Sequence, residues 1–205
     1  MDKYSKAEVK LFKKLNSPKK IQDFLANEIK HNPARDGIEC RSPRRVLREG
    51  KAHCMEGALL AAAILEFHGR PPLVMDLRST GKDLDHVVAL FKQFGCWGAI
   101  SKTNHGVLRY REPVYRTLRE LAMSYFHEYF LDSGKKTLRE YSAAFNLNRI
   151  NKLDWRITEK DLVEVPDILD SAKHFKILSK AQIKNLRKAD KIEIQMGKLV
   201  EWKGK

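Results

Sequence analysis

The fold of this chain is decided by a stretch that reads His53-Cys54-Met55-Glu56-Gly57-Ala58-Leu59-Leu60-Ala61-Ala62-Ala63-Ile64-Leu65-Glu66. Residues 58–65 are almost purely apolar and rich in helix-forming types, which predicts a buried helix. A charged segment, 41–51, ends just before the stretch, and Gly69-Arg70-Pro71-Pro72 stops the helix soon after Glu66. Cys54 therefore falls in the first turn of a buried helix.

The position of Cys54 favours the reactive form of its thiol. The backbone N–H groups in the first turn have no partner within the helix, and the helix dipole is positive there, so an anion is stabilised. A thiol at this place is biased toward the thiolate, which is the nucleophilic form. The alternative is that Cys54 only packs as a small apolar residue, since free cysteines are often buried. The histidine at position 86 shifts the balance toward the nucleophile.

The composition bounds the class of protein. With 205 residues, of which 42% are apolar, the chain can bury a core in one domain, or in one domain with an appendage. Cys40, Cys54 and Cys96 do not make a disulfide framework, so we expect a reducing, cytoplasmic setting. The first residues lack the apolar core of a signal peptide, and the longest apolar run, 58–65, is far shorter than the roughly 20 residues that span a bilayer. We expect no membrane partner.

The net charge of +14 has two explanations. It can attract a polyanion such as a nucleic acid, or it can belong to a lysine-rich solvated surface. The basic residues are spread along the chain without a run of about five or six adjacent ones. No motif of aromatic and basic residues that would stack on bases occurs either. Nucleic-acid binding is therefore an alternative that the sequence does not favour.

We expect three parts along the chain: an N-terminal helical segment (1–37), a core (38–150) and a C-terminal helical extension with a terminal hairpin (151–205). Between residues 5 and 31, apolar residues recur at helical spacing. A break near Asn16-Ser17-Pro18 makes this region one helix or two short ones.

Two further elements are expected from local patterns. Pro113 opens a predicted helix over 114–130, whose aromatic residues fall along one stripe. Near the end, alternating residues over 192–202 predict the terminal hairpin. We assign no chemistry to the part of the chain after residue 150.

Three strands are expected after the cysteine-bearing helix, at 73–77, 86–92 and 96–101. The last two are joined by Gln93-Phe94-Gly95, which is too short for a parallel crossover, so they form an antiparallel hairpin. The turn decides which residue lies opposite His86. It is Ser101 for a Gln93-Phe94 turn, Thr103 for a Phe94-Gly95 turn, and Lys102 for a three-residue loop.

A nucleophile at a helix N-terminus, a histidine on a following strand and an orienting group on the next strand form the thiol version of a catalytic triad. The order and spacing of Cys54 and His86 resemble the transglutaminase-like superfamily, a branch of the papain-like thiol enzymes, including its uncharacterised microbial members. The resemblance covers about residues 38–145. It is carried by His53-Cys54-Met55-Glu56-Gly57-Ala58, Asp85-His86-Val87-Val88-Ala89, Trp97-Gly98-Ala99-Ile100-Ser101-Lys102 and Leu108-Arg109-Tyr110-Arg111-Glu112-Pro113-Val114-Tyr115.

The resemblance implies an α+β fold with a transglutaminase-like, papain-like core. In such a core a buried helix that begins with the cysteine packs on a small antiparallel sheet, and other helices surround the two. The first of the three expected strands and the hairpin after it supply the sheet. Helices from both ends of the chain are expected to wrap this core.

The third member of the site departs from the superfamily. The resemblance implies an aspartate at the end of the strand next to the histidine strand, and this chain has Ser101 there, four residues after Trp97. A hydroxyl can accept the histidine N–H and fix its tautomer, but it cannot stabilise an imidazolium as a carboxylate does. Asn104, Asp83 and Asp85 are alternative third members if the loops bend.

The expected function is thiol-based acyl chemistry: hydrolysis of an amide or peptide bond, or transfer of its acyl group, on an unidentified protein or peptide. Cys54 attacks the carbonyl, His86 accepts and returns the proton, and Ser101 orients His86. The backbone N–H of Cys54 donates to the oxyanion. Two alternatives remain: a catalytically inactive scaffold of this fold that binds proteins, and a basic nucleic-acid-binding protein.

Neither a metal nor an organic cofactor is implied. Cys54, His86, His105 and His127 are of metal-ligating types, but no pair shows a short C-x-x-C or H-x-x-x-H spacing. Glycine-rich phosphate-binding loops do not occur either.

Overall fold

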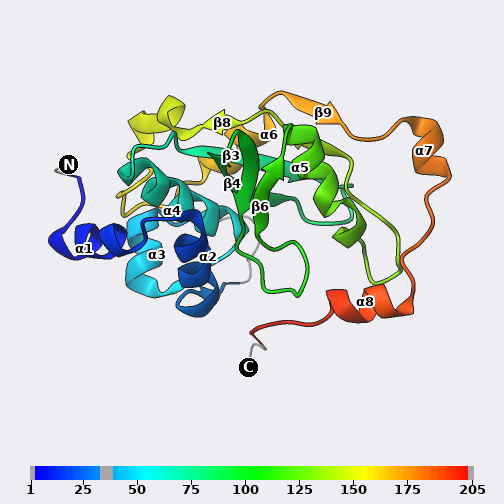
Figure 1. Ribbon diagram of the computed structural model, residues 1–205, viewed down its shortest axis with the longest axis horizontal. Helices are drawn as coiled ribbons and strands as arrows, with labels where there is room; N and C mark the ends of the chain where they lie inside the picture. The colour runs from blue at the N-terminus through cyan, green and yellow to red at the C-terminus, as the bar shows by residue number, and fades with distance from the viewer. Residues whose placement is uncertain (1–2, 33–38, 203–205) are drawn as a thin grey trace.

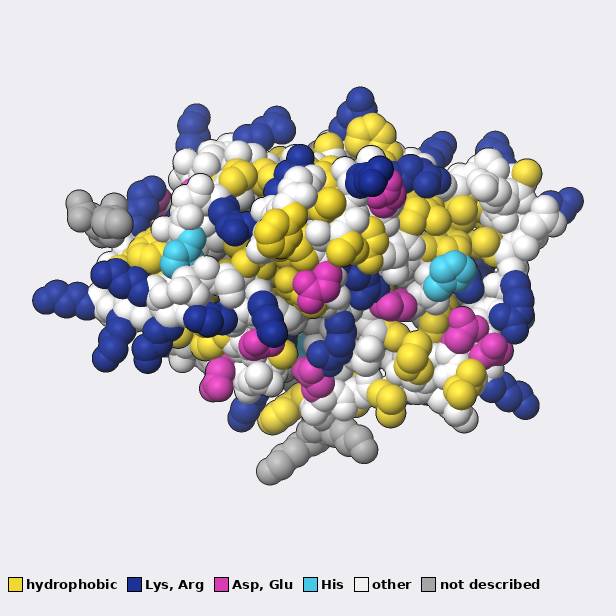
Figure 2. All heavy atoms as spheres, viewed as in Figure 1, with side chains coloured by type: hydrophobic (Ala, Val, Ile, Leu, Met, Phe, Trp, Pro, Cys, Tyr) yellow, Lys and Arg dark blue, Asp and Glu magenta, His cyan; other side chains and the backbone are white. Residues whose placement is uncertain are grey.

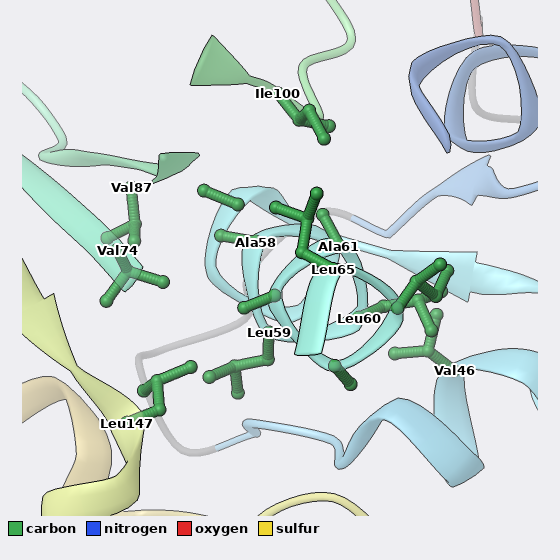
Figure 3. Packing of buried hydrophobic residues seen from close by; sticks show 14 of the residues in the cluster. Val46, Ala58, Leu59, Leu60, Ala61, Leu65, Val74, Val87, Ile100 and Leu147 are labelled. Carbon is green, nitrogen blue, oxygen red and sulfur yellow. The ribbon is translucent and has the colours of Figure 1, made fainter. Parts of the chain in front are cut away.

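Helix α4 (Cys54–Phe67) is the centre of the structure, a computed structural model that describes residues 3–32 and 39–202 (Figure 1). Every residue from 56 to 65 is buried. A helix that is apolar on every side must be covered on every side. Figure 3 shows this cover, which comes from Val46 on one side of the helix, from Val74 and Val87 on another, and from Ile100 and Leu147.

An antiparallel sheet of seven strands packs against α4. Its main path runs in the order β6-β5-β4-β3-β7-β9, and β7 and β8 pair with opposite ends of β3. The strands are β3 (Leu73–Arg78), β4 (His86–Gln93), β5 (Cys96–Ile100), β6 (Arg111–Tyr115), β7 (Glu140–Ser142), β8 (Phe145–Asn146) and β9 (His174–Lys176).

The two faces of the sheet carry different apolar clusters. Along β4, Val87 and Ala89 belong to the cluster around α4. Val88 and Leu90 alternate with them and belong to a second cluster, which includes Tyr125 of helix α5. The sheet is thus covered by α4 on one face and by α5 on the other, and Figure 1 shows α5 in front of the strands.

The α+β class and the three expected strands are confirmed, each strand to within one residue at either end. The sheet is larger than expected because short strands were not recognised. β6 was not recognised because it contains Arg111, Glu112 and Pro113 and has no alternation of apolar and polar residues. It lies at the edge of the sheet, where a proline is tolerated because one side of the strand needs no ladder partner.

The helix expected over 114–130 begins later than predicted. Its first residues belong to β6, and helix α5 (Leu118–Tyr125) starts after Thr117, whose side chain accepts the N–H of Glu120. A 3₁₀ turn, η1 (Phe126–Glu128), follows. The prediction was wrong at the start because Thr117 is the cap, whereas Pro113 lies in a strand. Tyr125, Phe126 and Tyr129 are buried in the core, whereas Phe130 is half-buried.

The hairpin between β4 and β5 turns at Phe94-Gly95. Both residues have positive φ angles, 53° and 76°, as a two-residue hairpin turn of type I′ requires. Gln93 consequently pairs with Cys96 and Ala89 with Ile100, where the ladder ends. The alternative with a Gln93-Phe94 turn is wrong, because it would place no glycine at either central position.

The N-terminal region forms two helices, α1 (Lys6–Lys14) and α2 (Pro18–Asn27), with the break at the predicted place. Ser17 caps α2, and Pro18 occupies its first turn. Both helices lie on the same side of the molecule as α3 and α4 (Figure 1). The expected boundary between residues 37 and 38 falls outside the described residues, so the three-part division stays a prediction.

A short parallel pairing brings the N-terminal region to the start of α4. Strand β1 (Lys30–His31) pairs with β2 (Lys51–Ala52), which follows helix α3 (Pro43–Glu49). His31 lies opposite Ala52 in this pairing. It therefore approaches the residues that open α4.

The C-terminal part consists mainly of short helices: η2 (Leu147–Leu153), α6 (Glu164–Asp170), α7 (Lys180–Lys184) and α8 (Lys191–Gly197). The hairpin expected over 192–202 is wrong. Asp190 and Glu193 cap each other's backbone N–H groups, and this reciprocal cap starts helix α8. Val200 forms only an isolated antiparallel bridge, with His105.

The surface agrees with the scattered distribution of charge in the sequence. Figure 2 shows lysine and arginine side chains around the whole outline of one face, without a single basic patch. Among residues 3–32 and 39–202, no helix is both long enough and apolar enough to cross a lipid bilayer.

The closest approach between α4 and the end of β5 occurs at Gly57, and it gives a stability prediction. A Cβ atom at this position would lie 2.4 Å from Cβ of Lys102. We expect Gly57→Ala to lower the free energy of unfolding by about 1–3 kcal/mol through overpacking, although alanine adds up to ~1 kcal/mol of helix propensity. Chemical denaturation measures the difference. Gly81→Ala is the control, because nothing lies within 4 Å of its Cβ position. A Gly57→Ala protein as stable as wild type would contradict the contact.

Candidate active site

A cavity of about 710 Å³ opens where the N-terminus of α4 meets the start of β4. Cys54 and His86, which lie far apart in the sequence, both line it. The remaining walls come from the loops at 83–85 and 102–108, the segment 128–133 after α5, and two residues of α8. The cavity is large enough for part of a peptide or a similar acyl substrate.

Cys54 is the first residue of α4 and is half-buried. The side chain of Glu56 turns back and accepts the N–H of His53 at 2.9 Å, which closes the start of the helix. The backbone N–H of Cys54 belongs to the first turn, whose N–H groups have no partner within the helix. It is therefore a donor that can face the cavity.

The thiol of Cys54 is strongly acidified. Burial alone would raise its pKa, but hydrogen bonds with the rings of His53 and His86, and the positive charge that each ring carries when it is protonated, hold the pKa well below its ordinary value. Cys40, by contrast, is buried and its pKa is raised, mainly by desolvation. Of these two thiols, only that of Cys54 is poised to ionise near neutral pH.

The ring of His86 is held by Ser101. Nε2 of His86 lies 2.8 Å from Oγ of Ser101, and both side chains are buried. The Ser101 hydroxyl donates its single proton to the carbonyl of Leu108 at 2.6 Å. It can therefore only accept from His86, so Nε2 carries the proton. The neutral ring then offers the lone pair of Nδ1 to the thiol.

Ser101 reaches His86 although the hairpin register does not place the two residues opposite each other. With the Phe94-Gly95 turn, His86 would face Thr103, and Ser101 is its diagonal neighbour on the same face. The side chain of Gln22, in α2, accepts the Ser101 N–H and donates to the Ser101 carbonyl, both at 2.9 Å. This amide replaces a neighbouring strand and holds the serine after the ladder has ended.

Leu108 completes the support of Ser101. Its φ angle is 59°, a conformation that residues with side chains rarely adopt. The N–H of Leu108 donates to Glu128 at 2.7 Å, and Glu128 is paired with Arg111. These contacts hold the Leu108 carbonyl against the hydroxyl of Ser101.

The other candidates for the third position have different partners. Asn104 forms two hydrogen bonds with the backbone of Trp202. Asp83 accepts from Thr137, and Asp85 accepts the N–H of Ser79. All three line the cavity. Of the four candidates, it is Ser101, which lies behind the cavity wall, that forms a hydrogen bond with the ring of His86.

The residues considered as metal ligands are not brought together. His105 contacts the carbonyl of Gly197, and His127 lies beside Lys136, away from the thiol. Within the described part of the chain, the carboxylates with a spacing suited to a metal ion are those of Asp76, Asp85 and Asp170, and this group does not include Cys54 or a histidine.

The sequence analysis missed His53 as a contact of the sulfur and missed the C-terminal wall of the cavity. His53 directly precedes Cys54, so its position at the helix cap was a usable signal. The wall could not be recognised, because it depends on long-range contacts. Gly106 donates to Leu199 and Glu201 donates to Asn104, both at 2.8 Å, and these bonds bring α8 to the cavity.

Comparison with models of protein families gives no match, and comparison with curated proteins gives none either.

The acidified thiol gives a labelling prediction. We expect iodoacetamide to modify Cys54 faster near neutral pH than Cys40 or Cys96, because an ordinary thiol with a pKa of about 8.5 is mostly protonated there. Peptide mapping after brief labelling measures the three rates. Labelling of Cys54 that is no faster than that of Cys96 at every pH, in folded protein, would rule out an activated thiol.

Proposed function

We propose that this chain is a thiol-dependent hydrolase or acyltransferase that acts on amide or peptide bonds, with Cys54 as the nucleophile. The observation that supports this most directly is the chain of contacts from the Cys54 sulfur through His86 to Ser101, in which the histidine tautomer is fixed. A thiol, a base and an orienting group in this order are the parts of a Cys–His acyl-transfer site.

The reaction follows from the positions of these groups. The thiol proton passes to an imidazole beside the sulfur, and Ser101 orients His86 for proton transfer. The sulfur attacks the substrate carbonyl, and the Cys54 N–H donates to the oxyanion that forms. The carbon–nitrogen bond breaks, the leaving amine takes a proton from imidazole, and a thioester remains on Cys54. Water then releases a carboxylic acid, or a second amine receives the acyl group.

The arrangement also supports a proposed relationship. A buried helix that begins with the cysteine, an antiparallel strand that begins with the histidine and a third group after the next strand are the features by which the sequence resembles the transglutaminase-like superfamily. We infer that the chain is a divergent member with serine in place of the aspartate. Its three free cysteines fit a reducing, cytoplasmic setting.

The function is tested by trapping the acyl-enzyme. The protein is mixed with an activated ester such as p-nitrophenyl acetate, with a peptide thioester and with peptide amides, and intact mass is followed over time. We expect a thioester on Cys54 that turns over, no thioester in Cys54→Ser, and turnover about 10²–10⁴-fold lower in His86→Asn. A folded protein whose Cys54 is alkylated by iodoacetamide but is never acylated would instead support the inactive scaffold.

The role of Ser101 has its own test. Ser101→Ala removes one neutral hydrogen bond, worth about 0.5–1.5 kcal/mol, so we expect turnover to fall roughly two- to tenfold. Ser142→Ala is the matched control, because Ser142 is also buried and its hydroxyl likewise accepts one hydrogen bond and donates another, away from the cavity. Equal turnover of Ser101→Ala and wild type, or an equal loss in both variants, would remove Ser101 from the site.

A further inference from the structure

We propose that His53 is a second catalytic histidine, which holds the thiol proton in the resting enzyme and delivers it to the leaving amine, with Glu56 supplying the negative charge behind the ring. This inference rests on the proposed function and divides its proton transfers between two imidazoles. His86 then serves as the base for the second nucleophile.

The hydrogen bonds of His53 fix its tautomer in the same way as those of His86. Nε2 of His53 lies 3.1 Å from the carbonyl of Glu39, and a carbonyl only accepts, so Nε2 carries a proton. Nδ1 is then the nitrogen that can take the proton of Cys54. Each of the two rings next to the sulfur therefore offers it one lone pair. The rings differ in the side chain that lies beside Nε2, on the far side of the imidazole from the sulfur.

A carboxylate stands behind His53. Nε2 is 3.5 Å from Oε1 of Glu56, whose side chain is fully buried. The other oxygen of Glu56 accepts the His53 N–H, and Arg41 donates to Oε1 through its backbone and its guanidinium at 2.9 and 3.0 Å. These bonds hold the carboxylate in place beside the imidazole.

Only a neutral hydroxyl stands behind His86. Ser101 orients the ring but carries no charge, so an imidazolium at His86 lacks the stabilisation that an imidazolium at His53 receives from Glu56. In agreement, the pKa of His53 is raised: burial lowers it, but the hydrogen bond and charge of Cys54 and the charge of Glu56 outweigh burial. The resemblance implies a carboxylate beside the histidine of the strand, His86. Here the carboxylate of Glu56 lies beside His53, the other histidine that contacts the sulfur.

Other ionisable groups around the thiol do not take this role. Burial and the nearby charge of Lys102 lower the pKa of His31, which favours its neutral form. Lys102 is buried and donates to the carbonyl of Leu25. Arg41 is paired with three carboxylates, those of Glu39, Glu49 and Glu56. Cys40 and Tyr129, which also lie near the site, both have raised pKa values because of burial, so neither supplies a positive charge.

The proton transfers balance over one turnover. At rest the S–H bond is broken and the proton is on Nδ1 of His53. When the thiolate has attacked and the carbon–nitrogen bond breaks, His53 gives this proton to the amine. Water then attacks the thioester, His86 takes its proton, and the thiolate leaves as the carboxylic acid forms. The proton on His86 returns to His53, and the site is restored.

The competing explanation is that His53 only caps the helix. A cap affects stability but has no reason to change the pH dependence of the thiol, so the two explanations give different results. His53→Asn is the suitable variant, because asparagine is among the best helix caps and removes the imidazole without removing the cap. Glu56→Gln is a second variant, which keeps the size of the side chain and removes its charge.

The experiment measures the rate of iodoacetamide labelling at Cys54 against pH for wild type, His53→Asn and His86→Asn, with thermal melts of each. We expect the midpoint of the profile to rise by at least about one pH unit in His53→Asn, which is tenfold less thiolate below the midpoint, and by less in His86→Asn. Glu56→Gln should move it in the same direction as His53→Asn. A His53→Asn profile that superimposes on wild type, or a larger shift in His86→Asn, overturns the proposal.

Two further measurements keep the outcome clear. In wild type, histidine-selective ¹³C and ¹⁵N chemical shifts near pH 7 should show an imidazolium at His53, and a neutral His53 ring overturns the proposal even if a variant fails to fold. With an activated ester, His86→Asn should accumulate the thioester on Cys54, whereas His53→Asn should form it slowly. Because alkylation needs no acyl substrate, a protein that forms no thioester would refute the proposed function and leave the labelling result to judge His53.

Discussion

Complete burial of helix α4 is the constraint on which the other parts of the structure depend. A helix without a polar face cannot lie at a surface, so the sheet, α2 and α3 must all pack against it. Each large side chain that is fully buried contributes roughly 1.5–3 kcal/mol relative to exposure. The cover stops at the two ends of the helix, and in the first turn the N–H groups of the backbone need an acceptor. The cavity opens there, so the same constraint that builds the core also places Cys54 at its mouth.

The choice of serine at position 101 has a physical reason in the structure. Its oxygen lies between two fixed groups, the N–H of His86, which donates, and the carbonyl of Leu108, which accepts. Only a side chain that donates and accepts at one atom satisfies both. An ionised aspartate there would face the carbonyl with a second acceptor. The uncharged side chain at this position is therefore tied to the left-handed conformation of Leu108, which brings the carbonyl close.

Periodicity and chain order predicted the parts of the site that depend on local sequence. The apolar stretch after Cys54 gave the helix, and the alternation after His86 gave its strand to within one residue. The prediction of Ser101 named the right partner of His86 through the wrong register, because diagonal neighbours can also touch across a hairpin. The helix at 191–197 was missed because isoleucines at alternate positions outweighed the cap formed by Asp190 and Glu193. The two hydrogen bonds between Gln22 and Ser101 could not be predicted, because no local sequence pattern connects residues that are 79 positions apart.

The two hydrogen bonds from Gln22 connect helix α2 with the candidate site. The side chain of Gln22 forms hydrogen bonds with both the N–H and the carbonyl of Ser101. The next residue, Lys102, donates to the carbonyl of Leu25, which lies near the end of α2. Helix α2 and the end of β5 are consequently coupled at two successive residues. A force or a binding partner that displaces α2 would pull Ser101 away from His86 without entering the cavity. Helix α2 thus supports the position of Ser101, and a chain that lost the segment up to the end of α2 would keep Cys54 but lose the two hydrogen bonds by which Gln22 holds Ser101.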